Sequence, residues 1–353
     1  MKKVAFIIYS LEMGGAERVI SELANKFSEK KSKIFIILFS QKKPYFDLNS
    51  NITLIHLPVL SDTSSIFIKI NNTFKRFYFL RKVILENDIT NIISFTTTIN
   101  IYSLIVSFLT PAKIIISERT DPLAHKIDSI LVVLRKLFYR FADKVVIQNK
   151  VQYDFYSKYV NSEKLLIIPN PVKKIVGNIY LNKEVNIISV GRLIKSKNHI
   201  ELIMCFKDAE INCKLIIIGD GDQKETIVDF LKKNDLQNRV ELLGSQKDVY
   251  KHLNPNCIFA STSLYEGFPN ALIEAMNAGL NCIHYDCPSG INEIIEDDVN
   301  GYLIPLNSKE IFTQKLKEVY QNSEKRIVIS ENAKIRAKDY DAEKISKKWE
   351  QIL

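Results

Sequence analysis

The chain has 353 residues, which exceeds the usual size of one domain and fits two domains of roughly 170 residues each. Hydrophobic residues make up 46% of the sequence and charged residues 25%, a globular composition that excludes a fibrous or disordered protein. The net charge of +9 is uneven, because residues 1–170 carry +10 and residues 171–353 carry −1, and this asymmetry points to an anionic partner for the first half.

The chain opens with a short apolar run, residues 3–8, that predicts a buried strand. The lysines before it resemble the start of a signal peptide, but Glu12 follows without a small-residue cleavage site. Gly14 and Gly15 then stand before a predicted helix. Such glycines let the backbone approach a ligand, and a helix N-terminus presents free N–H groups to a negative group, although packing alone also explains the turn. The spaced Gly-x-Gly-x-x-Gly pattern of dinucleotide-binding folds is missing.

Two further segments of the first half, residues 66–85 and 126–140, combine basic and aromatic residues in an amphipathic pattern. The basic residues are Lys69, Lys75, Arg76, Arg81, Lys82, Lys126, Arg135, Lys136 and Arg140. Together with the +10 charge, this make-up favours contact with an anionic membrane surface. Surface helices with snorkelling lysines look the same. No recognition-helix, zinc-finger or RNA-binding signature supports a nucleic-acid partner.

The longest uncharged stretch, residues 89–112, is long enough to span a bilayer. Polar residues interrupt it at Thr90, Asn91, Thr96, Thr97, Thr98 and Asn100. We therefore predict a buried strand, a polar turn and a buried helix in place of a membrane span.

Short β-branched apolar runs alternate with helix-length segments along the chain, which predicts parallel strands covered on both faces. The predicted strands are residues 3–8, 34–39, 52–56, 92–95, 113–117 and 144–148, then 185–190, 214–218, 240–243, 257–260 and 281–284. Between the two series, Pro169 and Pro171 flank Asn170 and can continue neither a strand ladder nor a helix. The predicted domains are therefore residues 1–170 and 171–339, and a helix within residues 340–353 is expected to pack back on the first domain.

The first strand of the second half is followed by Gly191-Arg192-Leu193 and, four residues on, by Lys197. The carboxyl ends of parallel strands form the ligand crevice of such sheets. A guanidinium and an ammonium there suit a diphosphate that gains charge as it leaves a sugar. A solvated basic loop has the same composition and is the alternative.

The most informative stretch follows the predicted strand at 257–260. Pro269 and Asn270 start a helix that Gly279 ends, so Glu266 lies in the loop before the helix and Glu274 one turn inside it. One carboxylate can meet a sugar while the other accepts hydrogen bonds from ribose hydroxyls, and the helix N-terminus between them can face a diphosphate. The alternative is two unrelated surface glutamates, but an ordinary surface loop rarely contains Glu-Gly-Phe-Pro.

Cys282, His284, Asp286 and Cys287 resemble a metal cluster, because strand alternation puts the first three on one face. A buried strand that runs into a Pro-Ser-Gly turn explains the same residues, so we predict no metal site. The five cysteines contain no Cys-x-x-Cys pair, which argues against a disulfide framework and fits a reducing cytoplasm.

Taken together, these motifs resemble retaining glycosyltransferase family 4, also called glycosyl transferases group 1. That family carries a Gly-Gly turn after its first strand, a Gly-Arg-Leu-x-x-x-Lys segment and a Glu-x7-Glu segment. The matching residues are Gly14-Gly15-Ala16-Glu17, Gly191-Arg192-Leu193 with Lys197, and Glu266 through Glu274. The resemblance covers nearly the whole chain and is most specific in residues 185–305. It implies the α/β fold named GT-B, in which two Rossmann-like domains with doubly wound parallel sheets face a central cleft.

The resemblance also implies roles for single residues. Arg192 and Lys197 would hold the diphosphate, Glu274 would bind the ribose, and Glu266 would contact the donor sugar near the reacting carbon. The remaining donor-binding residues would be Gly14, Gly15, Glu17, Gly191, Gly267, Phe268, Pro269, Asn270 and Ala271. Family members retain the anomeric configuration and generally need no divalent metal.

The chain departs from the family pattern after the predicted strand at 113–117, where many members place a histidine near the reacting centre. Here Glu118-Arg119-Thr120-Asp121-Pro122 follows, as in a subset of bacterial polysaccharide transferases. We hypothesise that Glu118 and Arg119 face the cleft on the acceptor side and serve catalysis. A loop ion pair is the alternative.

The sequence thus predicts an enzyme that moves a hexose or N-acetylhexosamine from a nucleotide diphosphate sugar, UDP-linked, to a saccharide acceptor with retention of configuration and no cofactor. The expected acceptor is a polyprenyl-diphosphate-linked saccharide, used for capsule, O-antigen or exopolysaccharide synthesis. The enzyme is expected in the cytoplasm, peripheral at the inner face of the bacterial membrane. Two alternatives stay open: a GT-B sugar-nucleotide epimerase, and a non-catalytic protein that binds membranes or nucleic acid.

Overall fold

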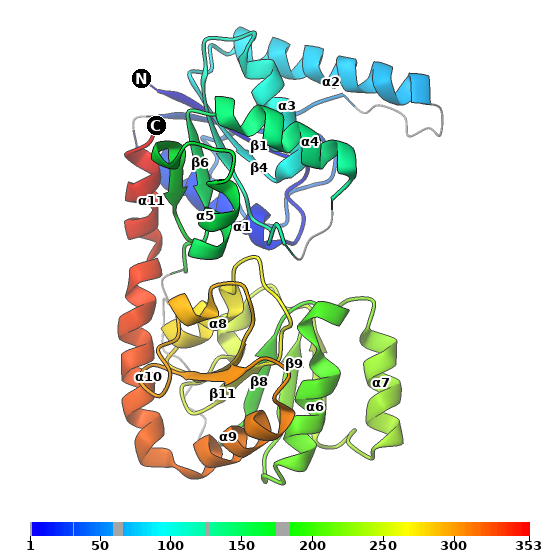
Figure 1. The fold of residues 1–353 in the computed structure, drawn as a ribbon, viewed down its shortest axis with the longest axis vertical. Coiled ribbons are helices and arrows are strands. Elements are labelled where there is room, and N and C mark those ends of the chain that lie inside the picture. The colour runs from blue at the N-terminus through cyan, green and yellow to red at the C-terminus, as the bar shows by residue number, and fades with distance from the viewer. Residues whose placement is uncertain (1, 31, 59–65, 124–126, 174–183) are drawn as a thin grey trace. The chain divides into compact units, whose positions relative to one another are not determined.

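A computed structural model describes residues 2–30, 32–58, 66–123, 127–173 and 184–353 (Figure 1). The chain divides into two compact units. Unit 1 comprises Met1–Pro171 and Glu343–Leu353, and unit 2 comprises Val172–Ala342. These boundaries lie within three residues of the predicted ones. Residues 174–183, which follow the predicted domain boundary, fall outside the described residues.

Unit 1 is built on a seven-stranded parallel sheet with the strand order β3-β2-β1-β4-β5-β6-β7. Its strands are β1 (Lys3–Ile8), β2 (Lys33–Leu38), β3 (Thr53–His56), β4 (Asn91–Phe95), β5 (Lys113–Ser117), β6 (Lys144–Ile147) and β7 (Leu165–Ile167). The sequence did not predict β7. This strand has three residues and pairs only with β6, so it shows little of the apolar pattern of the central strands.

Apolar side chains cover both faces of the unit 1 sheet. In β1, Ala5 and Ile7 belong to one buried cluster, and Val4, Phe6 and Ile8 belong to a second cluster on the other face. Continuous apolar strands of this kind are expected where helices pack on both sides.

The helices of unit 1 connect these strands, and one comes from the C-terminal end of the chain. They are α1 (Gly15–Ser28), α2 (Ile66–Glu86), α3 (Thr97–Ser107), α4 (Ser129–Phe138), η1 (Tyr139–Phe141), α5 (Lys150–Tyr156), η2 (Ser162–Lys164) and α11 (Ala342–Glu350). In α11, Trp349 is fully buried and stacks on Phe95 of β4, with ring centroids 6.0 Å apart. The last segment of the chain therefore completes the core of unit 1.

The uncharged stretch of unit 1 folds as predicted into a strand, β4, and a helix, α3, with Thr96 between them. No helix in the described part of the chain has both the length and the apolar character needed to cross a bilayer.

Unit 2 holds a six-stranded parallel sheet with the order β10-β9-β8-β11-β12-β13. Its strands are β8 (Ile187–Val190), β9 (Leu215–Ile218), β10 (Val240–Gly244), β11 (Ile258–Ser261), β12 (Asn281–Asp286) and β13 (Tyr302–Pro305). The sequence did not predict β13, a four-residue edge strand that ends at a proline. The helices are η3 (Lys195–Lys197), α6 (His199–Asp208), α7 (Lys224–Lys233), η4 (Val249–His252), α8 (Asn270–Asn277), η5 (Ile291–Glu293), α9 (Lys309–Gln321), α10 (Ser323–Ala337) and η6 (Lys338–Tyr340).

Each sheet has one point where the strand order reverses direction. This switch point lies between β1 and β4 in unit 1 and between β8 and β11 in unit 2. In open α/β sheets, ligands bind at the carboxyl ends of the strands beside such a point. The predicted site segments at Gly14, Gly191 and Glu266 all follow strands that flank a switch point.

Candidate functional site

Two loops of unit 2 meet at its switch point. The loop after β8 runs into η3, and the loop after β11 lies against it. The Leu264 N–H donates to the Ser196 carbonyl at 2.8 Å, and the Thr262 hydroxyl donates to the Asn198 carbonyl at 2.9 Å. These bonds hold two distant parts of the sequence in fixed register.

The two loops bring Lys197 and Glu266 into a bidentate ion pair. The Lys197 ammonium donates to both Glu266 carboxylate oxygens, at 2.5 and 2.6 Å. Burial raises the pKa of Glu266, but the charge of Lys197 and nearby polar groups outweigh it, so the net pKa lies below the usual value. Because Lys197 has three N–H donors and Glu266 accepts two bonds, a donor remains for an anionic ligand.

Further polar groups surround the Glu266 end of this pair, and the sequence did not predict their role. The Glu266 N–H donates to the Ser289 hydroxyl at 2.6 Å. The buried His284 ring donates its Nδ1–H to the Tyr285 carbonyl at 2.7 Å, and burial lowers the pKa of this histidine. His199, at the first position of α6, is also buried, and burial beside Lys197 lowers its pKa to about 4. Only the fold places these side chains around Glu266, since they come from β12, its following loop and α6.

Two glycines in the loop after β9 allow that loop to pack on the loop after β8. Gly219 has a φ of +149°, and a Cβ added there would lie 1.9 Å from the Gly191 carbonyl oxygen. A Cβ added at Gly221 would lie 2.4 Å from the Leu193 carbonyl oxygen. Any side chain at either position would push the two loops apart.

Arg192 lies on the same loop as Lys197 but in a different environment. Its side chain is exposed, and within the described part of the chain it has no ion pair or hydrogen bond. The two cations of this segment are therefore not equivalent, because one is fixed by a carboxylate and the other is open to solvent.

Helix α8 begins at Asn270, and the chain leaves it at Gly279 with a φ of +80°, as the sequence predicted. Glu274 is buried on this helix, in its second turn. The ring of Phe268 packs on Tyr340 with centroids 6.1 Å apart, which fixes the loop before the helix. The first N–H groups of α8 have no partner within the helix, so its N-terminus can accept a negative group.

In unit 1, the Gly14–Gly15 turn stands at the carboxyl end of β1. Gly14 has extended backbone and precedes α1. The Glu17 carboxylate lies over it, because a Cβ added at Gly14 would be 2.1 Å from a Glu17 oxygen. A phosphate that approaches Gly14 must therefore displace the Glu17 carboxylate. This is possible because the carboxylate stands at the end of a flexible side chain.

The expectation that Glu118 faces a cleft is wrong, because its side chain is completely buried inside unit 1. Thr97 donates to its two oxygens at 3.0 and 3.2 Å, Asn100 donates at 3.3 Å, and the Tyr139 hydroxyl also donates. Burial raises the pKa of Glu118 in spite of these donors. This carboxyl thus holds the start of α3 and the residue Tyr139 of η1 together in the interior of unit 1.

Arg119 is also held by its own unit, and it is 8% exposed. It donates to the Asn170 side chain at 2.5 Å, and its guanidinium lies over the rings of Phe95 and Trp349. Burial lowers its pKa to about 9. Among the described ion pairs none joins Glu118 to Arg119, so the alternative of a loop ion pair is wrong as well.

The residues considered as a metal cluster lie in and after the buried strand β12. Cys282, Tyr285 and Cys287 pack in the apolar cores of unit 2. Within the described ranges, no group of three or more His, Cys, Asp or Glu residues is placed to hold a metal ion.

Comparison with known proteins gives three kinds of similarity. Residues 174–336 match the model of the family described as glycosyl transferases group 1. An uncharacterized glycosyltransferase of Methanocaldococcus jannaschii is 31% identical over 68% of this chain and 71% of its own length. The GalNAc-α-(1→4)-GalNAc-α-(1→3)-diNAcBac-PP-undecaprenol α-1,4-N-acetyl-D-galactosaminyltransferase of Campylobacter jejuni is 27% identical over 100% of this chain and 98% of its own. The crystal structure of Anabaena HepE in complex with UDP-glucose aligns with a TM-score of 0.82 over 99% of both chains at 18% identity, which shows a common fold.

Proposed function

Because this chain belongs to the glycosyl transferases group 1 family and is a glycosyltransferase with the GT-B fold, we propose that it transfers a hexose or N-acetylhexosamine from a UDP-sugar to a polyprenyl-diphosphate-linked saccharide. The transfer retains the anomeric configuration, needs no metal, and serves the synthesis of a bacterial surface polysaccharide. The reaction takes place in the cytoplasm at the inner face of the membrane. The observation that carries this proposal is the Lys197–Glu266 pair at the switch point of unit 2.

The charges of unit 2 fit a diphosphate leaving group. As the bond between the anomeric carbon and the phosphate breaks, negative charge grows on the diphosphate. The remaining N–H donor of Lys197 and the exposed guanidinium of Arg192 can meet that charge. The N-terminus of α8 adds a further positive dipole.

The two glutamates take different parts in this proposal. Glu266, ionised and fixed by Lys197 and Ser289, would contact the sugar near its reacting carbon. Glu274, one turn inside α8, would accept hydrogen bonds from the ribose hydroxyls. The donor's own phosphate oxygen would take the proton of the acceptor hydroxyl, which then attacks the anomeric carbon.

The names of similar proteins support the choice of substrates. The Campylobacter jejuni relative is named for an acceptor linked to undecaprenol through PP. HepE was crystallised with UDP-glucose. We extend both to this chain as a UDP-sugar donor and a lipid-linked acceptor.

The first test is thermal stabilisation of the purified protein by UDP, GDP, ADP and their sugars in EDTA. A nucleotide at about 100 times its Kd should stabilise the protein by about 2.7 kcal/mol. We expect the largest shift with UDP or a UDP-sugar, and little shift in Arg192→Ala and Glu274→Gln. Lys195→Ala, which removes an exposed cation from the same segment, is the control and should respond like the parent.

Three outcomes would argue against the proposal. If none of the nucleotides shifted the melting temperature, the proposed donor site would not exist. Conversion of a UDP-sugar without any acceptor would identify an epimerase. A product of inverted configuration, seen by NMR of the transferred sugar, would exclude retention.

A further inference from the structure

Helices α2 and α4 of unit 1, together with the residues that follow α3, expose apolar side chains that the proposed function does not use. We propose that this surface, the α2–α4 face, docks on a bilayer that contains anionic phospholipids. This inference does not depend on the identity of the donor or the acceptor.

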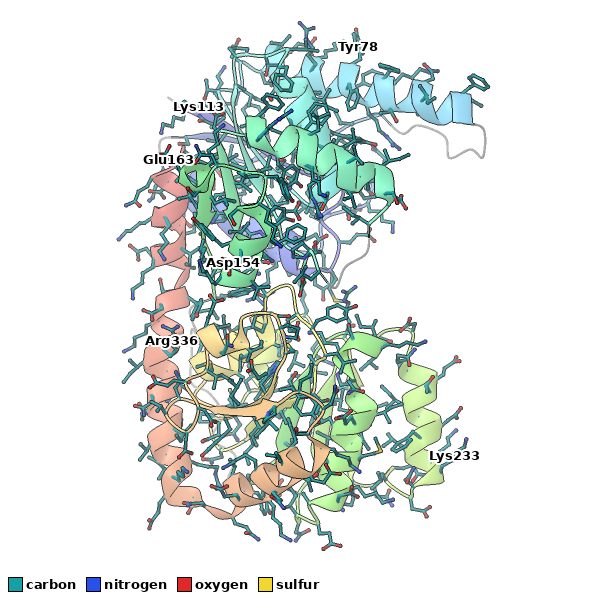
Figure 2. All side chains as sticks on the ribbon, viewed as in Figure 1. Tyr78, Lys113, Asp154, Glu163, Lys233 and Arg336 are labelled. Atoms are coloured by element: carbon teal, nitrogen blue, oxygen red, sulfur yellow. The ribbon has the colours of Figure 1, made fainter. Side chains whose placement is uncertain are left out.

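The outer side of α2 carries a stripe of apolar residues. Phe67, Ile70, Phe74 and Tyr78 are spaced three or four residues apart, which places them on one side of a helix. Phe67 is 81% exposed, Phe74 66% and Tyr78 60%. Figure 2 shows Tyr78 at the outer edge of unit 1. The opposite side of α2 is buried through Leu80 and Ile84, so the helix already has its core contact and turns a second apolar side to solvent.

Helix α4 has a similar stripe. Ile130, Val133 and Leu137 follow the same helical spacing, and Ile130 is 72% exposed. Residues 124–126, Lys126 included, lie outside the described residues.

The residues that follow α3 lie between η1 and α2. The exposed ring of Phe108 packs on Phe141 of η1, with centroids 5.2 Å apart. On the other side, Arg81 of α2 donates to the carbonyl of Leu109 at 3.3 Å. Figure 1 shows the three helices side by side in unit 1. Exposed apolar side chains therefore come from α2, from α4 and from Phe108 and Leu109 after α3, whereas single scattered apolar side chains are normal on a protein surface.

The charge of this surface selects an anionic partner. Helices α2, α4 and η1 contain eight basic residues, of which Arg135 is buried, and a single acidic one, Glu86. Lys75 and Lys136 are exposed next to the stripes, and Glu86 is already paired with Lys82 at 3.7 Å. Aromatic residues flanked by lysines match the interfacial region of a bilayer, where rings enter the acyl boundary and ammonium groups meet lipid phosphates. An acidic protein would satisfy the lysines but leave the exposed rings of α2 without an apolar partner.

The test is flotation of the full-length protein with vesicles of phosphatidylglycerol and phosphatidylcholine in equal parts, against vesicles of phosphatidylcholine alone. We expect binding to the anionic vesicles that weakens with added salt, and little binding to the neutral ones. Since one basic residue near the surface contributes about fivefold in affinity, Lys75→Gln with Lys136→Gln should weaken vesicle binding roughly 25-fold. Phe67→Ser with Phe74→Ser should weaken it at least as much.

A matched control removes two exposed apolar residues of unit 2, as Ile327→Ser with Val328→Ser on α10. It should bind vesicles like the parent. All variants should keep the thermal shift with nucleotide, which shows that they fold and separates this test from that of the proposed function. The inference is overturned if the parent does not float with anionic vesicles, or if the α2 and lysine variants float as well as the control. A dimer in solution that dissociates in the same variants would assign the surface to a second copy of the chain.

Discussion

At the scale of single residues, the Lys197–Glu266 pair determines both stability and charge in unit 2. Both side chains are largely buried, with 20% of the Lys197 side chain and 9% of the Glu266 side chain exposed. Each can remain charged in this buried position only because the other carries the opposite charge. Because the pKa of Glu266 is lowered, the pair stabilises the fold above the unfolded pKa, and this contribution is lost as the pH falls through the folded pKa.

Lys197→Met should therefore have two effects. Removal of the cation leaves a buried carboxylate without its partner and should destabilise unit 2 by about 3 kcal/mol. It also removes a donor to the leaving diphosphate, which should lower kcat by about 100-fold or more. The double variant Lys197→Met with Glu266→Gln should regain much of the stability, measured by thermal unfolding, while activity stays low. If activity returned with stability, the lysine would have a structural role alone.

Glu118 shows the opposite electrostatic behaviour. Its pKa is raised by burial, so the protonated form stabilises the fold below the unfolded pKa, and this contribution is lost as the pH rises through the folded pKa. Glu118→Gln should have a melting temperature close to that of the parent at about pH 4 and a higher one at about pH 8. It should keep most of the turnover. A loss of turnover without a change in stability would return Glu118 to the catalytic residues.

At the scale of elements, the loops that follow β8, β9 and β11 form the donor side of the proposed site. They contact one another through backbone atoms, as in the bond from Leu264 N–H to the Ser196 carbonyl. Their register depends on the small size of Gly219, because a Cβ at this position would overlap the Gly191 carbonyl. A change in this packing should also displace Lys197, because Lys197 follows Ile194 by three residues in the loop after β8.

Gly219→Ala should separate the loops, because its Cβ would overlap the Gly191 carbonyl oxygen at 1.9 Å. We expect a loss of at least about 2 kcal/mol of stability and a clear loss of nucleotide-induced stabilisation. Gly244→Ala is the matched control, since Gly244 also has a positive φ but a Cβ there meets nothing within 4 Å. It should cost about 1 kcal/mol from backbone strain alone and leave nucleotide binding intact. Equal effects of the two substitutions would mean that backbone strain, and not the contact between loops, is what matters.

At the scale of the whole molecule, the last residues of the chain belong to the first unit. Trp349 is buried against Phe95, and Lys2 donates to the Leu353 carbonyl at 2.8 Å. Unit 1 is therefore complete only once residues 343–353 have been synthesised. Its unfolding should respond to changes near the C-terminus, while unit 2 should not.

Trp349→Ala should destabilise unit 1 by about 3–5 kcal/mol, because it removes a fully buried aromatic ring. Calorimetry should then show a lowered transition for unit 1 beside an unchanged one for unit 2, since multidomain proteins need not unfold in one step. Ile335→Ala, at an exposed position of α10, is the control and should shift neither transition. A single transition that moves as a whole in Trp349→Ala would show that the two units unfold together.

Much of the fold could be predicted from the sequence, because it rests on local patterns. Buried parallel strands are continuous apolar runs, and α8 is bounded by Pro269 and Gly279, whose backbone preferences act within a few residues. The strands that the sequence missed, β7 and β13, are short and lie at sheet edges, where fewer residues need to be apolar. The family, and with it the activity as a glycosyltransferase, was also evident from the Gly-Arg-Leu and Glu-x7-Glu segments.

Only the tertiary structure decided which charged residues meet. Sequence spacing places Arg192 and Lys197 close together, yet packing of the loop after β11 fixes Lys197 on Glu266 and leaves Arg192 in solvent. The motif Glu118-Arg119 is adjacent in sequence, but donors on α3 and η1 draw Glu118 into the core while Asn170 and Trp349 hold Arg119. Strands, helix ends and glycine turns depend on neighbouring residues, so the sequence by itself determined them. The partners of charged side chains depend on contacts between distant segments, so only the tertiary structure decided them.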